Sequence, residues 1–222
     1  MRIPKLLILA TICFCIPILT IGQDSSVSVN SLIEAAEQGD VKAQYDLGSM
    51  YYRGEGVTQD YSDAAKWYRM AAEQGHLFAQ FFLGSMYYRG EGVSQNYSEA
   101  VKWYRRSAEQ GLSGAQFLLG SMYYNGEGVS QNYSEAVKWY RRSAEQGDAE
   151  AQYNLGWMYD NGEGVPQDYI SAYMWYDIAA SNGYETAAVD REFIAEAMTF
   201  NAIEEAKKRA RICLESNYKQ CD

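Results

Sequence analysis

The sequence predicts an all-α fold, a right-handed superhelical α/α solenoid of four helix-pair repeats with a C-terminal pair of capping helices. Two observations carry this prediction: apolar residues within each stretch of the chain follow helical spacing, and single residue types recur every 36 residues. The recurrences are clearest for Gly39, Gly75, Gly111, Gly147 and Gly183 and for Trp67, Trp103, Trp139 and Trp175. A fixed period of this length is typical of an array in which each unit packs on its neighbours.

The period divides the chain of 222 residues into parts. We predict a signal peptide over 1–22, an entry segment and helix over 23–38, and a capping helix pair with a disulfide tail over 183–222. The four repeats between them are expected at 39–74, 75–110, 111–146 and 147–182.

The first residues have the pattern of a secretory signal peptide. Arg2 and Lys5 precede an apolar run from residue 6 to 21, and Thr20 and Gly22 offer small side chains at a cleavage position. A retained membrane anchor is the alternative, but this run is shorter than the roughly 20 residues that span a bilayer. The prediction places the processed chain in the periplasm or outside the cell, with no stable membrane insertion.

Lipid attachment at Cys13 or Cys15 is a weaker alternative, since large residues precede both cysteines. Removal of the signal leaves Cys213 and Cys221. Because thiols in an oxidising compartment pair, we expect a disulfide that staples the C-terminal tail. A redox-active or metal-binding role is disfavoured by their spacing, and the sequence predicts no metal and no cofactor.

Each repeat is expected to hold two helices. In the first unit, Asp40 caps a helix that buries Ala43 and Leu47, and the glycine-rich turn at 54–56 ends it. Asp60 caps the second helix, with Asp63 at the reciprocal capping position, and its Trp67 lies on the buried face.

A glycine interrupts the first helix of every unit, at Gly48, Gly84, Gly120 and Gly156. Glycine costs about 1 kcal/mol relative to alanine inside a helix, so a packing reason is expected. We predict that the rings of Trp67 and its counterparts lie on these glycines.

After Gly183 the repeat pattern ends, and segments 184–197 and 200–215 are expected to form the closing helix pair, with Thr199 as a cap. Ile170, Met174 and Ile178 mark the face that this pair covers. At the other end, Leu32, Ala35 and Ala36 are expected to cover the first unit. They belong to the tail of an entering helix that we predict over 31–38.

The run AQYDLGSMYYRGEGV followed by DYSDAAKWYRMAAEQG resembles the Sel1-like repeat, a relative of the tetratricopeptide repeat. This resemblance covers residues 39–182 and implies an exported bacterial interaction scaffold whose groove holds a protein or peptide. A cysteine-rich subgroup of the family is linked to binding or hydrolysis of penicillin-like or cell-wall compounds, which is the alternative function. The repeats here contain no cysteine.

The sequence does not predict an enzyme. Residues that recur in all units are architectural, because a catalytic constellation needs a single geometry. His76 is the one histidine, and we expect it at the surface. The formal charge of −10 disfavours nucleic acid as a partner.

Differences between the units point to a binding surface. A stripe beside the buried face of the first helices is polar in the end units, whereas the central units place Phe78, Phe82 and Leu118 there, side by side. In helical-pair solenoids this face is concave, and an apolar patch with a polar rim is typical of a partner site. The predicted partner-binding residues are Lys42, Asp46, Arg53, Phe78, Phe82, Arg89, Leu118, Asn154 and Trp157. The alternative is that Phe82 and Leu118 thicken the core between units two and three.

The second helices carry a basic ridge, with Lys102, Arg105 and Arg106 repeated as Lys138, Arg141 and Arg142. Pairing of Lys102 with Glu99 and of Arg105 with Glu109 is expected to make this ridge a solvated face. A dock for an anionic partner is the alternative. We expect a monomer that binds one protein or peptide partner.

Overall fold

The computed structural model describes residues 23–221, and side chains from residue 29 onward. The predicted signal peptide lies outside the described residues. Within them the chain is all helical, as predicted. The helices are α1 Gln23–Glu37, α2 Val41–Arg53, α3 Tyr61–Glu73, α4 Leu77–Arg89, α5 Tyr97–Glu109, α6 Ser113–Asn125, α7 Tyr133–Ala144, α8 Ala149–Asn161, α9 Tyr169–Ser181, α10 Glu185–Ala195 and α11 Phe200–Glu215.

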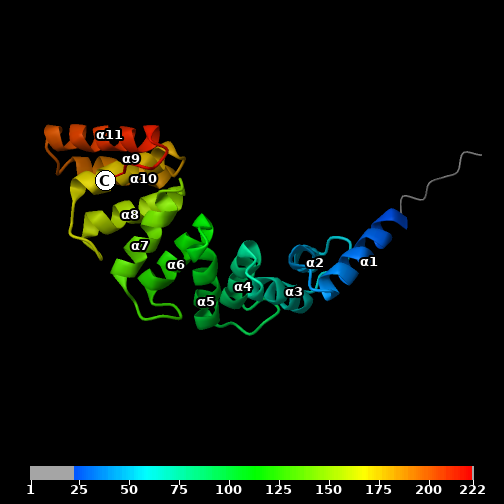
Figure 1. Cartoon of the computed structure of the whole chain (residues 1–222). Coiled ribbons are helices and arrows are strands. Elements are labelled where there is room, and N and C mark those ends of the chain that lie inside the picture. The colour runs from blue at the N-terminus through cyan, green and yellow to red at the C-terminus, as the bar shows by residue number, and fades with distance from the viewer. Residues whose placement is uncertain (1–22, 222) are drawn as a thin grey trace, which may run out of the picture.

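The helices follow one another along a curved array, with α1 at one end and α10 and α11 at the other (Figure 1). Each repeat contributes one antiparallel pair, α2 with α3, α4 with α5, α6 with α7 and α8 with α9, and each pair packs on the next. None of the described helices has the length and apolar character needed to cross a membrane.

Local sequence signals explain where the helices begin and end. Asp40 caps α2 by accepting a hydrogen bond from the amide of Ala43 at 2.7 Å, and Asn96 caps α5 through the amide of Glu99. Gly54 ends α2 in the left-handed conformation, with φ of 73°. The carboxylate of Glu99 accepts from the side chains of Lys102 and Trp103. The cap predicted at Asp40 is therefore confirmed. The reciprocal bond is not formed in unit two, because the amide of Asn96 donates to the carbonyl of Tyr87 and not to Glu99.

The glycines inside the first helices accommodate tyrosine rings, so the prediction of tryptophan there is wrong. A Cβ built at Gly48 would lie 2.7 Å from Cδ1 of Tyr68. The same relationship joins Gly84 to Tyr104, Gly120 to Tyr140 and Gly156 to Tyr176, at 2.8 Å. The tryptophans are buried nearby, and Trp67 packs against Leu47 and Ala36.

A ladder of amides ties each unit to the one before it. Gln80 is buried, donates from Nε2 to the carbonyl of Ala72 at 3.1 Å, and accepts from Gln110 at 2.7 Å. The equivalent buried residues are Gln44, Gln116 and Gln152, each with both bonds. These recurrent polar groups are satisfied within the fold, which identifies them as architecture.

The C-terminal cap forms as predicted. Thr199 caps α11 through the amide of Ala202, and both α10 and α11 pack on α9. Met174 and Ile178 are buried in one cluster with Ala210 and Cys213 of α11. A disulfide joins Cys213 to Cys221, as expected.

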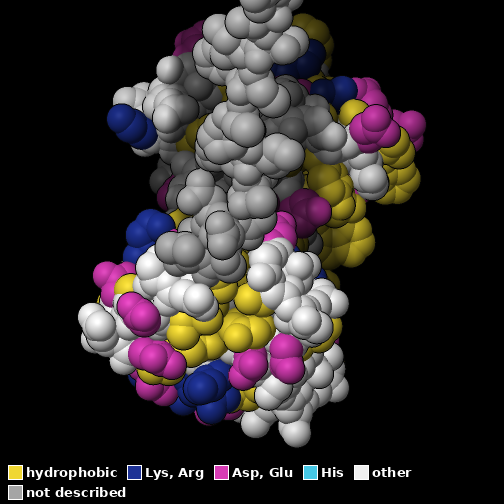
Figure 2. Space-filling model, turned by 90° about the vertical axis from the view of Figure 1, so that its right-hand side faces the viewer, with side chains coloured by type: hydrophobic (Ala, Val, Ile, Leu, Met, Phe, Trp, Pro, Cys, Tyr) yellow, Lys and Arg dark blue, Asp and Glu magenta, His cyan; other side chains and the backbone are white. Residues whose placement is uncertain are grey.

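At the N-terminal end, Leu32 and Ala35 are half-buried and Ala36 is buried against Leu47 and Trp67. The entering helix therefore covers the first unit, as predicted. Figure 2 shows this end of the molecule, where hydrophobic side chains reach the surface within a ring of acidic and basic ones.

Candidate functional site

The predicted stripe lies on the surface of the first helices. All nine predicted partner-binding residues are exposed or half-buried, whereas the neighbouring face, with Ala43 and Leu47, is fully buried. Phe78 has 46% of its surface exposed and Trp157 has 40%. The stripe therefore offers large apolar side chains to solvent in units two and four.

The structure separates Phe82 from Leu118. Phe82 packs in the cluster of units one and two, and its ring stacks on Tyr68 with centroids 5.4 Å apart. Leu118 packs in the next cluster, with Leu119 and Tyr104. The two side chains therefore fill successive seams of the array, and they do not share the single seam between units two and three that the sequence suggested.

Three residues peculiar to unit two converge on one ring of unit one. His76 stacks on Tyr45 with centroids 4.4 Å apart, and Phe78 and Phe82 each lie 6.3 Å from it. The other units carry Asp40, Leu112 and Asp148 at the position of His76, and no other unit carries Phe at either of the other two positions. We call the four residues Tyr45, His76, Phe78 and Phe82 the Tyr45 cluster.

The capping and stacking role of His76 is one that sequence reasoning missed. It is half-buried, and its Nδ1 accepts a hydrogen bond from the amide of Ala79 at 3.2 Å, so it caps α4. Burial lowers the pKa of its imidazole, and Lys42 adds to this effect, while Asp46 opposes it. The signal in the sequence was its position, because His76 stands where Asp40 and Asp148 cap the equivalent helices.

Lys42 and Asp46 lie close enough to the Tyr45 cluster to act on the pKa of His76. Lys42 and Asp46 form an ion pair of 2.5 Å, which raises the pKa of Lys42. Arg53 and Arg89 lie at the ends of α2 and α4, and Arg89 pairs with Glu91 at 3.8 Å. The cluster is therefore an aromatic centre with one ion pair beside it, and aromatic centres with polar neighbours are typical of protein-binding surfaces.

The remaining predicted site residues lie apart from this cluster, on α8. Asn154 donates to the carbonyl of Glu150, one turn earlier on the same helix. Trp157 occupies the position that is serine in the other three units. In unit one this serine, Ser49, bonds to the hydroxyl of Tyr68 at 3.1 Å. Trp157 thus changes the surface of unit four without joining the Tyr45 cluster.

The cationic side chains of the basic ridge contact neighbouring side chains of the same chain. Lys102 pairs with Glu99 at 3.1 Å, as predicted, but Arg105 donates to the hydroxyl of Tyr123 instead of pairing with Glu109. The guanidinium of Arg106 lies over the ring of Trp103, 4.8 Å from its centroid. These contacts favour the solvated-face interpretation of the ridge.

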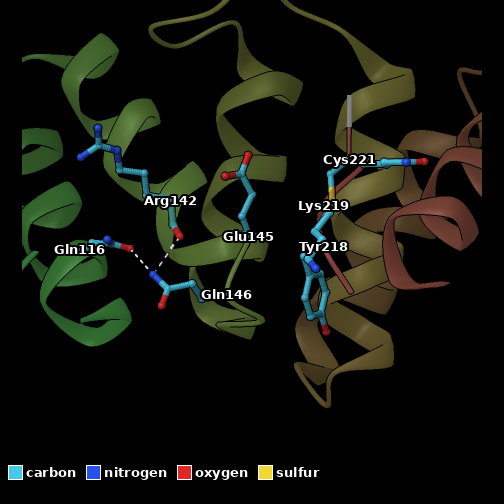
Figure 3. A pocket seen from close by; sticks show the side chains of 8 residues that line it. Gln116, Arg142, Glu145, Gln146, Tyr218, Lys219 and Cys221 are labelled. Atoms are coloured by element: carbon cyan, nitrogen blue, oxygen red, sulfur yellow. Dashed lines mark hydrogen bonds between the residues drawn. The ribbon is translucent and has the colours of Figure 1, made fainter. Parts of the chain in front are cut away.

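A cavity of about 710 Å³ lies between α6, the end of α7 and the C-terminal tail (Figure 3). Gln116 and Gln146 on one side belong to the amide ladder, with Gln146 donating to Gln116 at 2.7 Å. On the other side, Tyr218 rests on Gly147 and donates to Asn182. Its lining is therefore largely structural. Among the described residues, no group of three or more His, Cys, Asp or Glu side chains could hold a metal ion.

Comparisons with known proteins agree on one family. The Sel1 repeat model matches residues 41–76, 77–112, 113–148 and 149–184, a frame two residues later than the predicted units. No curated protein matches the chain.

Solved structures that are similar to the chain include two with a TM-score of 0.68. One is c5321, a protective antigen present in uropathogenic Escherichia coli strains and displaying an SLR fold. It is 44% identical over 72% of this chain, with a TM-score of 0.68, and the match spans only 34% of that protein. The other is a Sel1 repeat protein from Oxalobacter formigenes, 35% identical, with a TM-score of 0.68, over 83% of this chain and 82% of that one.

Cysteine-rich protein B from Helicobacter pylori also matches, at 24% identity and a TM-score of 0.47. A likeness at this level carries no functional argument. The family model and the Oxalobacter relative each cover more than half of the sequence, and the chain therefore belongs to the Sel1 repeat family.

Proposed function

We propose that the protein is an exported interaction scaffold that binds a protein or peptide partner through the Tyr45 cluster. One observation carries the proposal: His76, Phe78 and Phe82, all particular to unit two, gather around Tyr45 on the surface of the first helices. Residues that preserve the array recur in every unit, whereas these three do not, so the fold alone does not require them.

The composition of the surface supports a protein partner. Phe78 supplies an exposed aromatic anchor beside the ring of Tyr45, and Tyr45 in turn lies against the half-buried Phe82. Aromatic residues of this kind provide most of the binding energy at protein interfaces, and charged neighbours such as Lys42 and Asp46 add selectivity between partners. Export remains a proposal that rests on the signal-like residues 1–22.

Capture with matched variants tests the proposal. Phe78→Ser removes the exposed ring at the second position of α4, where serine is well tolerated. Ile212→Ser is the control, since Ile212 is also exposed, at 37%, but lies on α11. We expect the immobilised wild type and the Ile212 variant to retain the same partner from a cell-envelope extract, and the Phe78 variant to lose it.

The wild type and both variants must have the same circular dichroism and the same unfolding midpoint, so that a lost partner reports binding and not unfolding. Retention of every captured protein by a folded Phe78 variant would contradict the proposal. The double substitution Phe82→Asp with Leu118→Asp is a poorer test, because both side chains pack against the core.

A further inference from the structure

The fourth unit breaks a contact that the first three units share. In those units a tyrosine near the end of the first helix packs on the tyrosine that begins the second helix, with ring centroids 5.2 Å apart. These pairs are Tyr52 with Tyr61, Tyr88 with Tyr97 and Tyr124 with Tyr133. In unit four the second ring remains as Tyr169, but Asp160 replaces the first.

The missing ring leaves a cavity. A cavity of about 270 Å³ lies between the end of α8, the start of α9 and the end of α10. Its lining residues are Asp160, Tyr169, Phe193, Ile194, Glu196 and Ala197. In unit three the equivalent position, at Tyr133, is covered by the glycine-rich turn of unit four. Gly164 of that turn packs so closely that an added Cβ would lie 2.4 Å from the backbone of Tyr133. After unit four, the end of α10 borders this region and the cavity stays open.

Tyr169 keeps the position of its counterparts. Gln167 donates from Nε2 to the hydroxyl of Tyr169 at 3.1 Å and to the carbonyl of Asp160 at 2.7 Å. Gln131 makes the same two bonds to Tyr133 and Tyr124. The site therefore presents one fixed ring of a pair whose other ring is absent.

The cavity is acidic on one side and apolar on the other. Of the described residues that line it, two are acids, Asp160 and Glu196, and none is a base. Burial raises the pKa of Asp160, the hydroxyl of Tyr176 opposes this effect, and the nearby Asp190 adds to it. Phe193 and Val189, one turn apart on α10, are 74% and 68% exposed and extend the apolar side outward.

We propose that this cavity binds an arginine side chain of a partner protein, with the guanidinium between Asp160 and the ring of Tyr169. The next apolar residue of the partner then lies on Phe193 and Val189. A guanidinium is planar, so its shape replaces that of the missing ring. It also supplies a positive charge to pair with the two carboxylates, which have no base beside them in the lining.

The same chemistry occurs inside this chain. Arg106 lies over the ring of Trp103 at 4.8 Å, and Arg69 donates to the hydroxyl of Tyr87 at 2.6 Å. A second copy of the chain fits less well, because its equivalent surface would bring the same carboxylates together and the chain has a formal charge of −10. The cavity is separate from the Tyr45 cluster, so the two proposals can fail independently.

The probe is a fluorescent peptide, Gly-Ser-Gly-Arg-Leu-Gly-Ser-Gly, titrated into the full chain. Its control carries citrulline, which has nearly the shape of arginine without the charge. We expect saturable binding of the arginine peptide, at least about tenfold tighter than that of the citrulline peptide, because citrulline cannot form charge-assisted hydrogen bonds to Asp160.

Two substitutions at one position separate charge from shape. Asp160→Tyr restores the ring of the other units and should abolish binding without lowering the unfolding midpoint. Asp160→Asn keeps the cavity and should weaken binding about tenfold, and it decides the question if the tyrosine variant fails to fold. Phe78→Ser should leave the affinity unchanged.

Three results would overturn the proposal: no saturable binding of the arginine peptide, equal affinity for the citrulline peptide, or undiminished binding by both Asp160 variants. A fourth such result would come from analytical sedimentation, which measures self-association of the chain. Self-association that is lost in Phe193→Ser would assign the surface to a second copy of the chain instead.

Discussion

The ring of Tyr140 lies against the backbone of Gly120, so closely that a Cβ at position 120 would be 2.8 Å from its Cδ1. The ring is buried, which raises the pKa of its hydroxyl to about 12, and that hydroxyl bonds to Ser121 at 3.1 Å. The contact fixes the separation of α6 and α7. Its counterparts in the other units give the array its regular spacing.

Gly120→Ala should therefore destabilise the protein by about 1–3 kcal/mol, because the added methyl group forces the ring or the backbone to move. Gly114→Ala is the matched control on the same helix, where the nearest atom to the new Cβ is 3.7 Å away. That substitution should stabilise the protein by about 0.4–1 kcal/mol. Urea unfolding measures both. Equal effects of the two substitutions would show that the Tyr140 contact is not close-packed.

Phe78 and Phe82 should behave differently in the same measurement. Phe82→Ala removes a half-buried ring that stacks on Tyr68, and we expect a loss of about 1–3 kcal/mol in the free energy of unfolding. Phe78→Ala removes an exposed ring and should change stability by less than about 0.5 kcal/mol. A large loss with Phe78→Ala would place that residue in the core instead of on a binding surface.

Stability should fall on mild acidification because of His76. Its pKa is lowered by burial in the folded chain, from an ordinary value of 6.5, so the unfolded chain binds more protons in the window between the two values. The free energy of unfolding therefore rises with pH across this window, and the contribution of His76 is lost as pH falls through the folded pKa. Protonation also removes the Nδ1 acceptor that caps α4, a contact of about 1 kcal/mol.

Urea midpoints measured between neutral and mildly acidic pH test this expectation. His76→Asp is the control, because Asp40 and Asp148 cap the equivalent helices. In this variant the decrease near the ordinary histidine pKa should disappear while the helix stays capped. An unchanged pH profile would refute the role of His76.

The disulfide between Cys213 and Cys221 should stabilise the C-terminal cap. It closes a short loop with a sequence separation of 8, for which chain entropy gives about 2–3 kcal/mol. Cys221→Ser should lower the thermal midpoint and release Tyr218 from Gly147 and Asn182. Proteolysis at the tail of the oxidised and variant proteins checks the second effect. Equal resistance would show that packing alone holds the tail.

Local signals explain how much of the fold the sequence could predict. Asp40, Asn96 and Thr199 cap helices through contacts within three residues, so a single segment carries the information. The partner of Gly48 was assigned wrongly because Trp67 and Tyr68 both lie on the buried face. Only the crossing of two helices decides which of these adjacent rings meets the glycine.

The candidate sites depend on contacts between units, which periodicity does not report. The contact of His76 with Tyr45 joins two repeats, and the cavity at Asp160 depends on the α10 segment that borders it. In both places a residue departs from the repeat pattern. The sequence shows that His76 and Asp160 differ from their counterparts, but it does not show that His76 stacks on Tyr45 or that Asp160 lines a cavity with α10.

Photo-cross-linking tests directly whether the Tyr45 cluster binds a protein partner. A photoreactive phenylalanine analogue replaces Phe78 in one protein and Ile212 in another, and both are expressed in full length and irradiated in the cells that produce them. We expect one discrete covalent partner from position 78 and none of that partner from position 212. Equal labelling from both positions, or labelling from position 212 alone, would contradict it.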